Sequence, residues 1–139
     1  MDIVILLSRI VFSALFISSG VNHITQRQAM AGYATHKGVP QAMIATLVSG
    51  AMILAGGIMV LLGVWADLGS LLIAAFCFPT AVLMHAFWKE TDAQAKAMEM
   101  VQFSKDSALG GAALMLFGFF AYAGHDLGLT LTGPLFSLG

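Results

Sequence analysis

The chain has 139 residues, of which 59% are hydrophobic and only 9% are charged. Soluble globular domains carry about 25% charged residues, so this composition excludes a surface that faces water on all sides. It predicts a single integral membrane domain over residues 1–139. The net charge of -1 gives no reason to expect a nucleic acid partner, because a basic patch is the usual footprint of such binding.

Cys77 is the single cysteine, so the chain can form neither an intramolecular disulfide nor a zinc ribbon. We interpret it as a small buried hydrophobe. The nine methionines are scattered through apolar runs, which is typical of core packing rather than of copper binding. No phosphate-binding loop, dinucleotide fingerprint or nucleophile motif is present. The sequence therefore predicts no metal site.

The first apolar run, over residues 2–22, is long enough to cross the ~30 Å hydrocarbon core as a helix. It lacks the positively charged start of a secretory signal, so we expect a retained membrane helix. Arg9 lies inside this run, and a charge at such depth needs a partner. Asp67 is the first candidate and Asp126 the second. A structural pair or a snorkelling side chain is one interpretation of Arg9, and contact with a ligand is the other.

Three further membrane helices are expected over residues 41–64, 68–88 and 105–123. The glycines of the 41–64 run predict a closely packed face, and Pro79 predicts a kink in the next helix. Short interfacial helices are expected over residues 26–35 and within 89–104, the latter beginning at a capping box from Thr91 to Gln94. The tail, 124–139, carries no clear pattern. The predicted fold is all-α: an integral membrane antiparallel four-helix bundle with short interfacial helices in the two cytoplasmic connections.

Most of the basic residues are expected on one side of the membrane. Five lie in the two long connections: Arg27, Lys37, Lys89, Lys96 and Lys105. The N-terminus, the turn near residue 65 and the tail carry none. By the positive-inside rule, the connections are expected in the cytoplasm and both termini on the outer side.

Polar side chains from three helices are expected at the cytoplasmic depth: Asn22, His23, His85, Lys105 and Asp106. Histidine can donate, accept or titrate near neutral pH, which suits hydrogen bonding to a quinone carbonyl or transfer of its proton. His85 is the first candidate. The alternative is that these groups are solvated helix ends. A haem held by His23 and His85 is a further alternative that we do not expect.

Five segments in order resemble the DoxX family of small bacterial membrane proteins. They are Arg9 with FSALFISSGVNHI at 12–24, the Gly38-Val39-Pro40 element, GGIMVLLG at 56–63, HAFW at 85–88 and QFSKDSALGG at 102–111. The resemblance covers the chain up to about Gly124. It implies a four-helix bundle in the bacterial inner membrane, so the outer side expected for both termini is the periplasm.

The family includes proteins linked to terminal quinol oxidase and to thiosulfate:quinone oxidoreductase. Arg9, His85 and Lys105 stand at matching positions. Three positions depart from the family pattern: His23 replaces a lysine, Ile53 replaces a frequent glutamate, and Asp106 replaces an asparagine.

We therefore expect a membrane subunit of a quinone-linked redox system, at most one subunit of an oxidoreductase. It would bind a quinone or anchor a partner through Arg9, Asn22, His23, His85 and Lys105. The rival hypothesis is a non-enzymatic accessory or assembly subunit that packs against a larger membrane complex. A small-solute transporter is a third, weaker alternative, because the two hairpins show no internal similarity. The expected partners are the lipid bilayer and another membrane or membrane-associated subunit, and the glycine-lined faces leave a homo-oligomer open.

Overall fold

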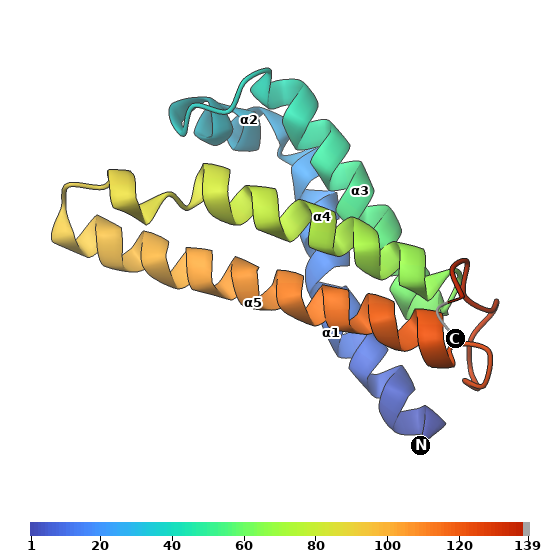
Figure 1. The fold of residues 1–139 in the computed structure, drawn as a ribbon. Coiled ribbons are helices and arrows are strands. Elements are labelled where there is room, and N and C mark those ends of the chain that lie inside the picture. The colour runs from blue at the N-terminus through green and yellow to red at the C-terminus, as the bar shows by residue number, and fades with distance from the viewer. Residues whose placement is uncertain (138–139) are drawn as a thin grey trace.

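The computed structural model describes residues 1–137, which form five α-helices and one short 3-10 helix (Figure 1). The elements are α1 (Asp2–Thr25), α2 (Arg27–His36), α3 (Ala42–Leu62), α4 (Ala66–Met84), η1 (Phe87–Lys89) and α5 (Ala93–Ala123). Helices α1, α3, α4 and α5 are long and apolar enough to cross a membrane. The predicted all-α bundle with four membrane helices is confirmed, and the protein is a multi-pass membrane protein.

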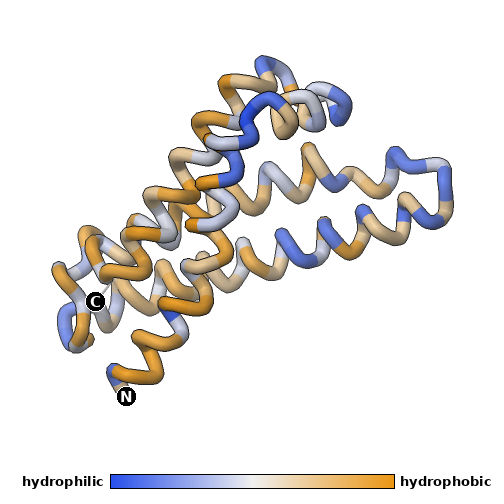
Figure 2. The backbone as a smooth tube through the Cα atoms, turned by 180° about the vertical axis from the view of Figure 1, so that it is seen from behind, coloured by the Kyte–Doolittle hydropathy of each residue, from blue (hydrophilic) through white to orange (hydrophobic). Residues whose placement is uncertain are grey.

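The helices form two arms. In the first arm α1 packs along α3, with α2 at its end, and in the second arm α4 packs along α5. Figure 1 shows the arms converging near both chain termini and diverging toward the two polar connections. Figure 2 shows that hydrophilic residues gather at these connections, whereas the long helices are mostly hydrophobic. The two arms are thus in contact at the end that holds the termini and apart at the end that carries most of the charge.

Glycines bring neighbouring membrane helices close together. A Cβ atom on Gly20 of α1 would lie 2.9 Å from the carbonyl oxygen of Gly50 in α3. A Cβ atom on Gly56 of α3 would lie 2.8 Å from the carbonyl oxygen of Gly69 in α4. Both distances are shorter than van der Waals contact, so only glycine fits without a backbone shift. The packed glycine face predicted for residues 41–64 is confirmed.

The second connection differs from the prediction. Helix α5 is continuous from Ala93, so the separate interfacial helix expected within 89–104 is instead its first turns. Its N-cap is Asp92, whose carboxylate accepts a hydrogen bond from the backbone N–H of Ala95, and the predicted capping box at Thr91 is wrong. Asp92 accepts from one of the N–H groups in the first turn that have no partner within the helix. From Ala93 to Leu109 the sequence contains no glycine or proline that would interrupt the helix.

Helix α4 ends at Met84, four residues earlier than predicted, and His85 is its C-cap. The chain then turns through η1, where the rings of Phe87, Trp88 and Phe103 pack edge to face with centroids 5.2 to 5.7 Å apart. This cluster holds η1 against α5. The imidazole of His85 therefore leaves the end of α4 in the direction of α5.

The tail is ordered against the converged end, although no structure was predicted for it. The backbone N–H groups of Leu131 and Thr132 donate to the carbonyl oxygen of Gly63, at 3.1 and 3.0 Å. The N–H of Phe136 donates to Oδ2 of the buried Asp67 at 2.7 Å. Residues 125–137 therefore cover the turn between α3 and α4.

Candidate functional site

A cavity of about 640 Å³ lies between the two arms, and all five α-helices contribute to its wall. Most of the wall is apolar. The titratable side chains that line it are His23, Tyr33, Cys77, His85, Lys105 and Asp106. Small-molecule sites in proteins are typically clefts of roughly 300–1,000 Å³ with apolar walls and a few convergent polar groups. This cavity has both properties.

Three of the five predicted site residues meet at this cavity. His23 reaches it from the last turn of α1, His85 from the end of α4, and Lys105 from α5. Asn22 lies on the exposed side of α1 and does not line the cavity, and Arg9 lies elsewhere. These three side chains, which the sequence places near one depth on three helices, line the same cavity together with Asp106.

His23 is fixed by two contacts. Its Nδ1 lies 2.8 Å from the carbonyl oxygen of Ser19, and because a carbonyl only accepts, Nδ1 carries the proton in this contact. The ring packs edge to face on Phe76 of α4, with centroids 5.8 Å apart. Nε2 of His23 remains for a hydrogen bond with a ligand.

His85 lies between two carboxylates of α5. Its Nδ1 is 2.8 Å from Oε2 of Glu99, and its Nε2 is 3.5 Å from Oδ2 of Asp106. Glu99 and Asp106 are seven residues apart, which is two helical turns, so both carboxylates project from the same face of α5. The continuity of α5 through residue 104 is what places Glu99 beside His85.

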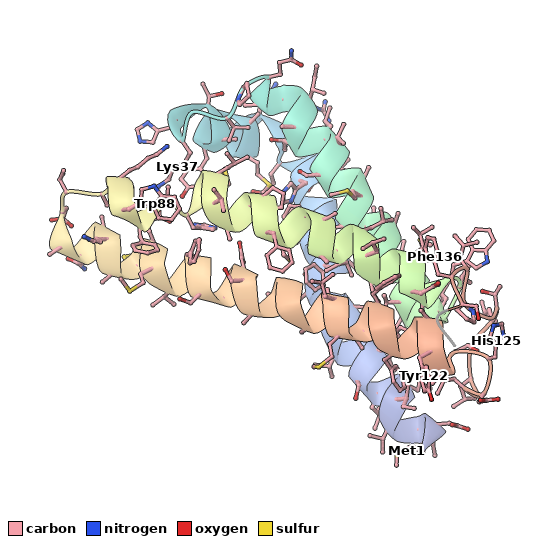
Figure 3. All side chains as sticks on the ribbon, in the orientation of Figure 1. Met1, Lys37, Trp88, Tyr122, His125 and Phe136 are labelled. Atoms are coloured by element: carbon pink, nitrogen blue, oxygen red, sulfur yellow. The ribbon has the colours of Figure 1, made fainter. Side chains whose placement is uncertain are left out.

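Lys37, at the end of α2, connects the two arms. Figure 3 shows its side chain reaching toward the second arm. Its Nζ lies 2.6 Å from Oε1 of Glu99 and 3.2 Å from Oε1 of Glu90. The hydroxyl of Tyr33 also donates to Glu99, at 3.4 Å. Glu99 thus joins α2 to His85.

Two donors in this network stay protonated over a wide pH range. The hydrogen bond that Lys37 donates to Glu99 raises the pKa of Lys37 above its usual value, although burial of the ammonium opposes this. Burial, followed by the negative charge of Glu99, raises the pKa of Tyr33. At neutral pH the ammonium and the phenol therefore both donate to the Glu99 carboxylate.

Sequence reasoning missed Glu99, Lys37 and Tyr33 as site residues. It assigned Glu99 to a separate surface helix, so the spacing from Glu99 to Asp106 was not read as one helix face. Lys37 was interpreted only as a basic residue of the polar connection, and Tyr33 as part of the interfacial helix over residues 26–35. The seven-residue spacing of two acids in a run without glycine or proline was the signal that could have found Glu99.

Arg9 does not form the ion pair with Asp67 or Asp126 that was considered from the sequence; it binds backbone carbonyl groups instead. Its side chain is 3% exposed and donates to the carbonyl oxygens of Val60 at 2.8 Å, Leu61 at 2.6 Å and Leu129 at 2.8 Å. Within residues 1–137 it forms no ion pair with Asp67 or Asp126. The last carbonyls of α3 have no partner within their helix, and the guanidinium supplies their donors. Arg9 therefore joins the end of α3 to the tail.

The comparison with protein families agrees with this architecture. The DoxX family matches residues 4–86, which include α2 to α4 and α1 from its third residue, together with Arg9, His23 and His85. Glu99, Lys105 and Asp106 lie beyond the matched region. No curated protein and no solved structure matches the chain. Because the match covers more than half of the residues and the fold has four apolar membrane helices, the chain belongs to the DoxX family.

Proposed function

We propose that this protein is a membrane subunit of a quinone-linked redox system, and that the cavity between its arms binds the head group of a quinone or quinol. The observation that carries the proposal is the meeting of His23, His85 and Lys105 at one apolar cavity among membrane helices. A quinone has two carbonyl oxygens that accept hydrogen bonds and a hydrophobic tail that partitions into lipid. The electrons would pass to or from a partner oxidoreductase, as the DoxX membership suggests.

The chemistry of the wall fits such a ligand. The ammonium of Lys105 can donate to a quinone oxygen, and the unprotonated Nε2 of His23, on a different helix, can accept from a quinol hydroxyl, so the two groups can address separate oxygen atoms. Phe16, Phe76 and Leu83 supply apolar surface for a planar ring. The cavity wall thus supplies both the polar groups and the apolar surface that a quinone or quinol head group requires.

The test is quinone binding by the purified full chain in lipid nanodiscs, titrated with ubiquinone and with menaquinone. We expect saturable binding of one of them, and about tenfold weaker binding of its quinol form by His85→Ala, the size expected for losing the hydrogen bond from a quinol hydroxyl to Nε2 of His85. Lys89→Ala is the control, because Lys89 is exposed at the same end of the molecule but does not line the cavity. If neither quinone binds saturably, the proposal fails.

A second candidate is an accessory subunit that packs against a larger complex. It is favoured by Gly111 and Gly118 of α5, where an added Cβ atom would meet nothing within 4 Å. The two glycines are seven residues apart on one helix face, and such small residues let a neighbouring membrane helix approach closely. Gly111→Leu and Gly118→Leu should then abolish co-purification of a partner complex from native membranes. Gly32→Leu on α2, an equally open site, should not. Co-purification that survives both α5 substitutions contradicts this candidate.

A further inference from the structure

Three titratable groups form a line from the cavity wall toward water. Asp106 and His85 line the cavity, and Glu99 follows on the other side of the imidazole. The Glu99 carboxylate only accepts hydrogen bonds when it is ionised, so Nδ1 of His85 donates its proton to Glu99. In the neutral imidazole Nε2 is then unprotonated, on the side of Asp106 and the cavity. The His85 ring therefore has one nitrogen toward each end of the line.

The other charged groups near the line differ in exposure. The side chains of Glu99 and Lys37 are each 15% exposed, whereas that of Glu90, the second partner of Lys37, is 31% exposed. Tyr33 also contacts Glu99, and Lys105 lies 3.8 Å from Oδ1 of Asp106. His23 and Cys77 complete the titratable groups of the cavity wall. The side chain of Lys105, beside Asp106, is 53% exposed, whereas Glu99 leads through Lys37 to Glu90 in the polar connection between η1 and α5. The Glu99 end of the line therefore runs toward the polar connection.

We infer that His85 relays protons between a hydroxyl-bearing ligand in the cavity and the aqueous surface, with Glu99 as the group that passes the proton to water. Asp106 is a positioning residue, which lies 3.5 Å from Nε2 and stabilises the cationic form of the ring once Nε2 is protonated. The inference rests on the proposed function, because the ligand is taken to be a quinol or hydroxyquinone. It goes further in assigning a direction of proton transfer and a role to two carboxylates.

The proton transfer conserves atoms and charge and requires no electron donor or acceptor. The O–H bond of the ligand breaks and an N–H bond forms at Nε2 of His85. The N–H bond at Nδ1 then breaks, and an O–H bond forms at Oε2 of Glu99. The ligand has gained one negative charge, Glu99 has lost one, and the imidazole is neutral again, with its proton now on Nε2 instead of Nδ1. Glu99 releases its proton to water beside Lys37 and Glu90, and its carboxylate is restored.

The test uses the full chain in nanodiscs, a hydroxynaphthoquinone with a titratable hydroxyl, and the methyl ether of the same compound. Binding is measured in weak buffer with a pH-indicator dye, at a pH where the free hydroxyl is protonated. We expect wild type to bind both compounds and to release about one proton for each bound hydroxy compound. We expect no proton release with the methyl ether.

The decisive variant is Glu99→Gln, which retains a hydrogen-bond acceptor for His85 but cannot take up its proton. We expect it to lose proton release while it keeps its affinity for the methyl ether, which also shows that the variant is folded. Glu90→Gln is the matched control, because Glu90 contacts Lys37 but not His85. It should release protons as wild type does. Asp106→Asn is a second variant, expected to lower proton release together with affinity for the hydroxy compound.

The outcomes separate the two proposals. If wild type binds neither compound, the quinone site and the relay both fail. If wild type binds both and Glu99→Gln releases as many protons as wild type, the relay is overturned and the site stands. Equal loss of proton release in Glu90→Gln and Glu99→Gln also overturns the relay, because the contact with His85 would then not be the cause.

Discussion

At the scale of single residues, Arg9 is the clearest case of a buried charge without a charged partner. Its three hydrogen bonds to backbone carbonyls connect α1, the end of α3 and the tail. Replacing it by alanine leaves these carbonyls without donors in a water-poor region. We expect Arg9→Ala to lower the free energy of unfolding by about 3 kcal/mol, the upper range for hydrogen bonds to a charged group.

Unfolding by denaturing detergent in mixed micelles measures this loss. Arg9→Lys is the informative comparison, because lysine keeps the charge but lacks the planar fork that reaches several acceptors. It should recover only part of the stability. Full recovery with lysine would mean that charge rather than hydrogen-bond geometry is what the site requires.

The sequence predicted several side chains that line the cavity, but it did not predict the hydrogen bonds and ion pairs that connect His85 to Glu99 and Lys37. His23, His85 and Lys105 were found because their helix ends could be placed at one depth from hydropathy alone. Glu99 and Lys37 were missed because their role depends on how α5 and α2 are placed in space. Ile53, which replaces the family's frequent glutamate, is 0% exposed in the apolar core. The two carboxylates that contact His85 come instead from α5.

At the scale of helices, close approach of α3 and α4 depends on Gly56. A Cβ atom there would meet the backbone of Gly69 at 2.8 Å and Ile73 at 3.1 Å. Gly56→Ala should therefore destabilise the fold by about 1–3 kcal/mol, as overpacking of a tight core does. Gly111→Ala is the matched control, since its site is open, and it should be neutral or stabilising by up to about 1 kcal/mol through helix propensity. Thermal unfolding in detergent compares the two, and equal effects would show that helix propensity rather than packing decides.

The start of α5 gives a second prediction at this scale. Asp92 caps the helix through the N–H of Ala95, at 2.8 Å. Asp92→Ala should reduce stability by about 1 kcal/mol, the typical cost of losing an N-cap, and should increase hydrogen exchange in the first turn of α5. Thr91→Ala should change neither, because Thr91 makes no capping bond among the described residues. If Thr91→Ala reduced stability and Asp92→Ala did not, the helix would begin at the capping box from Thr91 to Gln94 that the sequence suggested.

The number and order of the membrane helices were predictable from the sequence, because apolar runs of about 20 residues have few alternatives in a bilayer. The boundaries around residues 85–104 were not. Helix α4 ends at Met84 because the Phe87, Trp88 and Phe103 rings pack together, and hydropathy does not report such a tertiary contact. The tail was unpredictable for a similar reason, since backbone hydrogen bonds to Gly63 and Asp67 hold it in place.

At the scale of the whole molecule, the diverging arms are bridged by Lys37 (Figures 1 and 3). Glu99 raises the pKa of Lys37 in the folded state. A raised pKa means that the stabilisation is fully present below the ordinary lysine pKa and is lost only as the pH rises through the folded-state value. The bridge should therefore persist throughout the neutral range and weaken only in strongly alkaline solution.

Cys77 provides a readout of this bridge, because it is the single cysteine, lines the cavity and is 1% exposed. We expect Lys37→Ala to let the arms separate more often and so to speed modification of Cys77 by a membrane-permeable maleimide. A bridge worth about 1 kcal/mol corresponds to an increase of about fivefold. Lys89→Ala, which removes an exposed lysine at the same end, should leave the rate unchanged. Unchanged labelling in Lys37→Ala would show that helix packing at the converged end alone keeps the cavity closed.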